Sequence, residues 1–189
     1  MRTKEFDPDV VLGRALDAFW ENGYERTSLV DLVARMGIGR RSLYDTFGDK
    51  NALFLQVLQR YAHEREAGFR EIVDRAPDAR QALRVLLETA VAQGVVLRRG
   101  CLTVNTATEP GAGDEACALV QRQLDSSKEL VGELIERGRR DGSISSSSDG
   151  AVLTAAVFNA WLGLRVRVRA GAGVDELMAD VASVLGLLD

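Results

Sequence analysis

The chain has 189 residues, of which 46% are hydrophobic and 28% are charged. This composition supports a packed core and excludes an intrinsically disordered chain. The 24 basic and 28 acidic side chains give a net charge of −4 and a pI near 5.2, which argues against a protein that binds nucleic acid through its overall charge. Two cysteines are too few for a disulfide framework, and a single histidine leaves few ways to build a metal site or an acid–base catalyst. We expect no metal and no cofactor.

The sequence carries no signal for export or membrane insertion. Its start lacks the apolar run of a signal peptide. The longest mostly apolar stretch, residues 151–164, is shorter than the roughly 18 residues that suggest a membrane span. We therefore expect a cytoplasmic protein with no membrane partner.

Helical periodicity runs through the chain, and only three prolines interrupt it, so we expect an all-α protein of about nine helices. Asp7 and Pro8 form a typical helix start, and Gly23 a typical end. The alternating run Arg165–Arg169 continues an apolar helical pattern, and we interpret it as the basic end of a helix. The expected helices are 8–22, 29–36, 40–47, 50–73, 78–97, 101–108, 114–140, 149–169 and 174–187.

The second and third expected helices are short and are joined by the turn Gly37-Ile38-Gly39, which is the pattern of a helix-turn-helix. On a helical wheel, Leu43 and Phe47 fall together on one face of the third helix. Arg41 and Asp45 fall on the opposite face. This arrangement predicts a recognition helix that is buried on one side and free to enter a DNA groove on the other.

The outward side chains have chemistry that suits DNA. Arg41 can form bidentate hydrogen bonds with guanine in the major groove, and Asp45 can accept from cytosine or orient Arg41. Other side chains are better placed for the DNA backbone, where contacts fix register without reading sequence. These expected backbone contacts are Thr27, Arg40, Ser42, Tyr44 and Lys50.

Residues 27–50 resemble the DNA-binding signature of the TetR family of transcriptional repressors, and the likeness extends over about residues 10–55. The matching positions are Thr27, Asp31-Leu32, Gly37-Ile38, Leu43-Tyr44, Phe47, Lys50 and Leu53-Phe54. The chain departs from the family at Val33, where a small residue is common, at Gly39, where a serine or threonine caps the helix, and at Asp45. These departures concern the operator sequence more than the fold.

The resemblance implies a homodimer that binds a near-palindromic double-stranded DNA operator and is released by a small-molecule effector of unknown identity. Residues 1–50 would form the DNA-binding domain, and residues 51–189 the ligand-binding and dimerisation domain. The last two expected helices form the natural dimer surface, since 149–169 is apolar nearly all round. The alternative is that 149–169 is the central core helix of one subunit.

Cys101 follows Gly100 at the expected start of a helix. A helix N-terminus with Arg98 and Arg99 nearby would lower the pKa of its thiol, as in a redox or electrophile sensor. The alternative is a buried, inert cysteine. We expect Cys101 to line a ligand pocket with other side chains, although the two asparagines could instead satisfy local hydrogen bonds. These further pocket residues are Asn105, Phe158, Asn159 and Trp161.

Two other classes of protein compete with the repressor. An enzyme with Cys101 as nucleophile lacks a convincing base, because the only histidine, His63, shows no relation to it. A helical adaptor would bind protein rather than DNA. The charge distribution favours DNA, since residues 26–50 contain five basic and three acidic side chains within an otherwise acidic chain. We therefore expect a regulator and no enzymatic activity.

Overall fold

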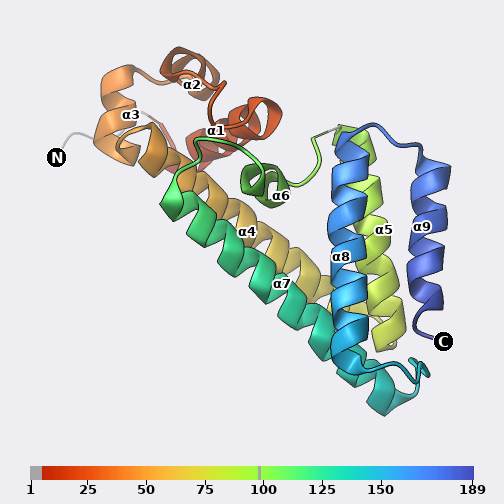
Figure 1. The fold of residues 1–189 in the computed structure, drawn as a ribbon. Helices are drawn as coiled ribbons and strands as arrows, with labels where there is room; N and C mark the ends of the chain where they lie inside the picture. Colours follow the sequence, from red (N-terminus) through yellow and green to blue (C-terminus); the bar gives the residue numbers. More distant parts are fainter. Residues whose placement is uncertain (1–5, 98) are drawn as a thin grey trace.

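The computed structural model describes residues 6–97 and 99–189. Within these residues the protein consists of nine α-helices and contains no strand (Figure 1). This confirms the expected all-α fold, and each helix ends within two residues of its predicted bounds. The helices are α1 (Pro8–Asn22), α2 (Leu29–Met36), α3 (Arg40–Phe47), α4 (Lys50–Arg75), α5 (Ala79–Leu97), α6 (Leu102–Ala107), α7 (Asp114–Asp141), α8 (Gly150–Arg169) and α9 (Val174–Gly186).

Local capping explains why the first helices begin and end where they do. The Asp7 side chain accepts a hydrogen bond from the Asp9 amide at the start of α1. Ser28 and Asp31 form a reciprocal capping box at the start of α2. Gly37 ends α2 in the left-handed conformation, with φ 70°, which side chains other than glycine rarely adopt. These signals are local, so the sequence alone was enough to place these helix ends.

The N-terminal unit, α1–α3, packs on the first half of α4. Its buried cluster runs along the chain from Val11 to Tyr61 and also takes in Cys101 and Leu102, which lie before and at the start of α6. Phe19 and Phe54 pack at its centre with their rings tilted by 58° and their ring centroids 4.9 Å apart. The hydrophobic core of the N-terminal unit therefore includes residues more than 40 positions further along the chain.

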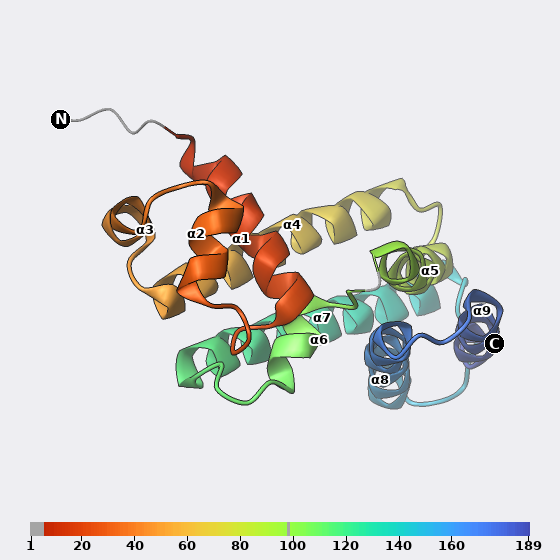
Figure 2. The ribbon, with the colours of Figure 1, turned by 90° about the horizontal axis from the view of Figure 1, so that it is seen from above.

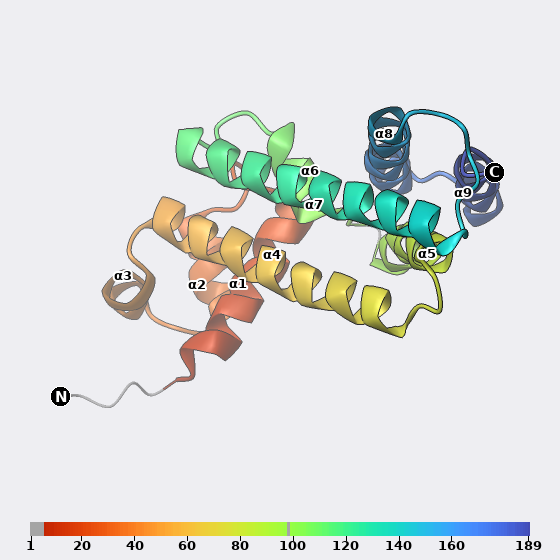
Figure 3. The same ribbon diagram turned by 90° about the horizontal axis from the view of Figure 1, so that it is seen from below.

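The C-terminal bundle is formed by α5, α7, α8 and α9, and it has a second buried cluster of its own. In the view from above, α1–α3 lie at one end of the molecule and α5, α8 and α9 lie at the other (Figure 2). Helices α4 and α7 run side by side in the same direction between them (Figure 3). The second half of α4 packs against the bundle through Phe69, Ile72 and Val73. Helix α4 thus contributes to both buried clusters.

Helix α8 differs from the expectation for its apolar run. By length and composition it could cross a membrane, with a mean hydropathy of 1.3, because the apolar pattern continues beyond Leu164. Seven of its side chains, among them Val157, Trp161 and Val168, are nevertheless buried against the protein. Its hydrophobicity therefore serves packing, as in the core helix of a bundle.

The close packing of α5 on α8 predicts opposite effects for two glycine substitutions. A Cβ at Gly94 would overlap the branched side chain of Val168, whereas a Cβ at Gly68, in the middle of α4, meets nothing within 4 Å. We expect Gly94→Ala to lower the free energy of unfolding by about 1–3 kcal/mol through overpacking. The control Gly68→Ala should raise it by about 0.5–1 kcal/mol through helix propensity. Urea unfolding measures both values, and equal effects would contradict the described packing.

Candidate DNA-binding interface and buried cysteine cluster

Helix α3 is held in the N-terminal unit by a narrow apolar face. Leu43 is fully buried and Phe47 is 5% exposed, and they pack in the same cluster as Leu32 and Met36 of α2. The turn between the two helices is closed by Ile38, which is also buried. Helices α2 and α3 therefore form a helix-turn-helix with α3 on the outside of the molecule (Figure 1).

The outward face of α3 is formed by side chains that the sequence placed there. Arg40, Arg41, Tyr44 and Asp45 are exposed, while Ser42 is half-buried at the edge. The Arg41 side chain is 94% exposed, and its Nε lies 3.7 Å from Asp45 Oδ2. An ion pair this exposed contributes little to stability. Arg41 is therefore free to reach a ligand, and Asp45 can orient it.

The first turn of α3 has free backbone donors. Gly39 at its N-cap provides no side-chain hydrogen bond, and a Cβ there would meet nothing within 4 Å. The amide groups of the first turn consequently remain available to an anion such as phosphate. Lys50, at the start of α4, lies 4.2 Å above the centre of the Tyr24 ring, so this aromatic contact positions its ammonium group.

Thr27 has a different position from the one expected. It is fully buried, and its hydroxyl donates to the Gly23 carbonyl at 2.5 Å. A side chain with no exposed surface cannot contact a DNA backbone in this conformation. Thr27 instead closes the turn between α1 and α2, which is a structural reason for a threonine at this position.

A second group of polar contacts joins the N-terminal unit to the rest of the molecule through residues 99–102, which we call the junction segment. Arg99 forms ion pairs with Asp17, at 2.7 Å, and with Glu21 on α1. The Trp20 indole donates to the Gly100 carbonyl at 3.2 Å. From the other side, Arg169 of α8 donates to the Arg99 carbonyl at 2.9 Å. The junction segment therefore connects α1 with α8.

Cys101 lies within this junction and is fully buried. The Tyr61 hydroxyl donates to its Sγ at 3.5 Å, and Arg65 Nη1 donates to it at 3.3 Å. Arg65 Nη1 also lies 3.4 Å from the Thr103 hydroxyl. Arg165 of α8, 5% exposed, stacks on Trp161 at 4.3 Å from the ring centre. We call Tyr61, Arg65, Cys101 and Arg165 the cysteine cluster.

The cysteine cluster favours a thiolate. Burial alone raises the pKa of the Cys101 thiol, but the positive charges of Arg65 and Arg165 and the hydrogen bond from Tyr61 outweigh burial and lower this pKa to about 7. Burial raises the pKa of Tyr61, so its hydroxyl stays protonated and remains a donor. Burial also lowers the pKa of Arg165. A substantial fraction of Cys101 is therefore ionised near neutral pH.

The charges that lower the pKa of Cys101 are not the ones that the sequence led us to expect. Arg99 turns away toward Asp17 and Glu21, and Arg98 lies outside the described residues. Arg165 is not part of a solvated helix end either; only Arg167 and Arg169 are basic residues of the last turn of α8. The available signal was that Arg165 follows Trp161 by four positions and so shares its buried face. Arg65 gave no such signal, because only the fold brings α4 next to residue 101.

The expected ligand-binding residues do not form one pocket. Asn105 lines an open hollow between α1, α6 and α8 and donates to the Arg99 carbonyl at 2.8 Å, which fits its alternative role in a local hydrogen bond. Phe158 and Trp161 are buried in the C-terminal bundle, 6.0 Å apart. Asn159 is exposed on α8 in the single subunit. Asn105 contacts Cys101 through its backbone amide, which donates to the Cys101 carbonyl at 2.8 Å, and Trp161 approaches Cys101 through Arg65 and Arg165.

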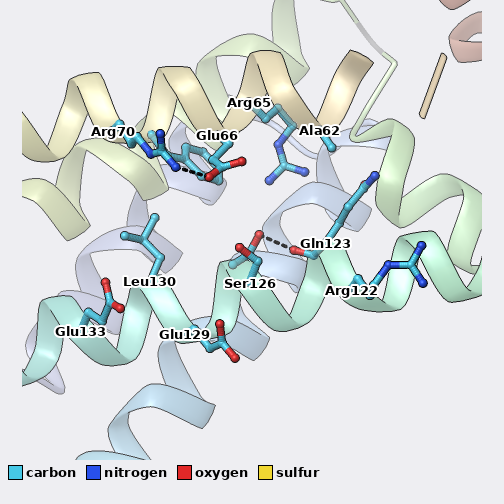
Figure 4. A pocket seen from close by; sticks show the side chains of 12 residues that line it. Ala62, Arg65, Glu66, Arg70, Arg122, Gln123, Ser126, Glu129, Leu130 and Glu133 are labelled. Carbon is cyan, nitrogen blue, oxygen red and sulfur yellow. Dashed lines mark hydrogen bonds and ion pairs between the residues drawn. The ribbon is translucent and has the colours of Figure 1, made fainter. Parts of the chain in front are cut away.

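A separate cavity of about 410 Å³ lies between α4 and α7 (Figure 4). Arg65 points into it from α4, and Gln123 faces it from α7. Phe69 and Leu130 provide apolar wall. Its size falls within the range of small-molecule sites. Within the part of the chain that the structure describes, no cluster of His, Cys, Asp or Glu side chains could hold a metal ion.

A bundle of helices that carries an outward-facing helix-turn-helix defines a class, the helix-turn-helix transcriptional regulators. Residues 11–57 match the model of the family described as "Bacterial regulatory proteins, tetR family". The chain is 31% identical over 192 residues to an uncharacterized HTH-type transcriptional regulator, YezE of Bacillus subtilis strain 168, with 100% and 99% of the two chains covered. The chain belongs to the TetR family, and it is a DNA-binding transcriptional regulator, not an enzyme.

Two further similarities are informative. The HTH-type transcriptional repressor ComR of Escherichia coli strain K12 is 32% identical over 195 residues, with 98% of this chain and 90% of ComR covered. Among solved structures, a cysteine mutant of the TetR family regulator CifR is 31% identical and superposes with a TM-score of 0.90 over 100% of both chains. That mutant is complexed with 26bp double-strand operator DNA.

The pKa of Cys101 predicts a pH dependence of stability. Because this pKa falls from 9.0 to about 7 on folding, the thiolate stabilises the folded state fully above about pH 9, and this contribution is lost as the pH falls through about 7. The free energy of unfolding of the wild type, minus that of Cys101→Ser, should therefore rise between about pH 6 and pH 9. Urea unfolding across this range measures it; a difference that is flat with pH would show that Cys101 titrates normally.

Proposed function

We propose that the protein is a homodimeric repressor whose two α3 helices enter successive major grooves of a near-palindromic operator. The observation that carries this proposal is the outward face of α3, where the Arg41 side chain is 94% exposed and lies close to Asp45. Arg41 reads a guanine, and Asp45 orients Arg41 or accepts from cytosine. Arg40, Ser42, Tyr44 and Lys50 contact the DNA backbone. The operator complex of the CifR mutant supports this use of the fold.

The charge distribution fits operator recognition by an acidic protein. Residues 26–50 carry a local net charge of +2, whereas the chain as a whole carries −4. Phosphate contacts are thereby limited to the reading surface, and binding to random DNA is weak and sensitive to salt. Such a protein acts where the chromosome is, so we place it in the cytoplasm.

The dimer forms through α8 and α9. Large apolar side chains remain exposed on these helices in the single subunit, which indicates a surface that a partner covers. Val152 and Val166 lie on α8 on the same stripe as Asn159, at intervals of seven residues. Val174 and Met178 extend this apolar surface on α9. Two helices from each subunit can then pack as a four-helix bundle.

Residues 1–50 form the DNA-binding domain, and residues 51–189 form the ligand-binding and dimerisation domain. Helix α4 begins at the boundary between the two domains and packs against both. An effector in the cavity between α4 and α7 touches the same α4 helix that carries Tyr61 and Arg65. A movement of α4 therefore also changes the contacts of the junction segment and of α1. Release is a population shift between conformations that fit the operator and conformations that do not.

A second candidate function is thiol sensing at Cys101, and the cysteine cluster favours it. The thiolate attacks an electrophilic carbon such as that of a maleimide double bond; a C–S bond forms, the π bond breaks, and the resulting carbanion takes a proton from water. Because Cys101 is fully buried, the adduct cannot fit without moving the junction segment. The modified protein therefore releases its operator.

Arg41→Ala tests the reading role. We expect it to weaken binding to the operator by about 1–3 kcal/mol and to leave binding to random DNA largely unchanged, because a bidentate base contact is lost. Titration of labelled operator and of random DNA at several salt concentrations measures both. An equal loss on both DNAs would make Arg41 a phosphate contact, and failure of the wild-type dimer to bind operator at low salt would overturn the repressor proposal.

Cys101→Ser tests the second candidate against a matched control, Cys117→Ser, because Cys117 is free and exposed. Both variants should bind operator as the wild type does. N-ethylmaleimide should release the wild type and Cys117→Ser from the operator but leave Cys101→Ser bound. Release of Cys101→Ser at the wild-type rate would refute thiol sensing.

A further inference from the structure

The cysteine cluster holds more positive charge than its own groups can balance. Among the described residues neither Arg65 nor Arg165 forms an ion pair with a carboxylate. Arg65 lies instead against aromatic rings, 4.9 Å from the centre of Phe69 and 5.1 Å from that of Trp161. One thiolate at most faces these two guanidinium groups. Buried charge is costly unless it is paired, so the cluster calls for a further anion.

The hydrogen-bonding groups show where this anion binds. Arg65 Nε and Nη2 are buried and have no acceptor, and Arg165 Nε has none either. Nε and Nη2 lie on one edge of the guanidinium, and this edge offers two parallel N–H groups to a carboxylate. The other side of the group, through Nη1, is already occupied by Cys101 and Thr103. Arg65 therefore has an unused bidentate edge.

The cavity between α4 and α7 gives a ligand access to Arg65. In Figure 4 the Arg65 side chain extends from α4 into this space, with Gln123 on the opposite wall. Ala62, Phe69 and Leu130 form an apolar wall beside it. Glu129 and Glu133 also line the cavity, together with Arg122 and with Arg70, which is paired with Glu66. Apart from Arg65, the lining thus carries two positive and three negative side chains, and this excess of acidic groups disfavours a ligand of high negative charge.

We propose that this cavity binds an organic monocarboxylate, with its apolar body against Phe69 and Leu130 and its carboxylate on the free edge of Arg65. This inference rests on the proposed function, since it names the chemical class of the effector. The excess of acidic over basic groups around Arg65 disfavours inorganic phosphate, which carries more charge and has no apolar body. Ligand binding turns the Arg65 guanidinium so that its Nε–Nη2 edge faces the cavity, because these two nitrogens are closed off from solvent in the described conformation.

Arg65 then links the ligand to Cys101. A carboxylate that draws the guanidinium toward the cavity weakens its contact with Sγ, which is 3.3 Å long here. The thiolate loses one of its two cationic neighbours and becomes less populated. Ligand binding and thiolate formation therefore oppose each other, and this coupling is reciprocal.

The binding test uses phenylacetate and its neutral analogue phenylacetamide, with acetate and inorganic phosphate as further probes. For the wild-type dimer, calorimetric titration should show phenylacetate binding at least about tenfold more tightly than each of the other three, a difference of about 1.4 kcal/mol. Equal binding of phenylacetamide would overturn the requirement for an anion. Equal binding of phosphate would overturn the organic class, and no binding of phenylacetate would overturn the proposal altogether.

Two variants locate the site. Arg65→Gln should lose the preference for phenylacetate over phenylacetamide. The matched control Arg70→Gln removes a cation from the same cavity that is already paired with Glu66 and is 74% exposed; it should keep the wild-type preference within about twofold. Circular dichroism and operator titration show that both variants fold. If Arg65→Gln folds and keeps the preference, the anion does not bind at Arg65.

The coupling has its own readout. In a Cys117→Ser background, phenylacetate should slow the reaction of Cys101 with iodoacetamide at neutral pH, and phenylacetamide should not. An unchanged rate at saturating phenylacetate would overturn the link between ligand and thiol. Operator binding by the same preparation separates the outcomes: a dimer that binds operator but has no carboxylate preference refutes this inference alone, whereas one that binds carboxylate but no operator refutes the repressor.

Discussion

Two guanidinium groups buried beside a single sulfur atom are the constraint on which the rest of this structure depends. Arg65 and Arg165 reach Cys101 from α4 and α8, and Tyr61 completes the contact from α4. These groups connect α4 and α8 with the junction segment, and an anionic sulfur compensates part of their positive charge. The energy of the cysteine cluster therefore depends on the chemical state of Cys101, which is what a regulatory site requires.

The junction segment couples the chemical state of the cysteine cluster to the position of the N-terminal unit. Cys101 and Leu102 belong to the same buried cluster as Phe19 and Leu43, so they cannot shift without disturbing the packing beneath α1 and α3. Arg99 adds ion pairs to α1 from the adjacent position. In a second contact, the Glu25 amide donates to Glu109 Oε1 at 3.0 Å and joins the loop after α1 to the loop after α6. Contacts on both sides of α6 thus transmit its movements to the helix-turn-helix.

The sequence predicted the helices and the buried and exposed faces of α3 well, because both depend on local information. Caps such as Ser28 and turns such as Gly37 act within a few residues, and the wheel positions of Leu43 and Arg41 follow from helix geometry alone. The cysteine cluster could not be predicted from the sequence, because it depends on contacts between distant residues. Arg65 and Cys101 are 36 positions apart, Arg165 is further still, and no local pattern shows that they meet. The burial of Thr27 and the exposure of Asn159 were equally hard to foresee, because the burial of a side chain depends on its neighbours in the fold.

The central claim is that chemical modification of Cys101 moves the two α3 helices of the dimer relative to each other. A distance measured between the two N-terminal units tests this claim most directly. Spin labels on Val30→Cys, an exposed position of α2 outside the reading helix, in a Cys117→Ser dimer report the separation of the two N-terminal units. The account predicts that alkylation of Cys101 after labelling shifts this distance distribution in the free dimer. An unchanged distribution with Cys101 fully modified would contradict it.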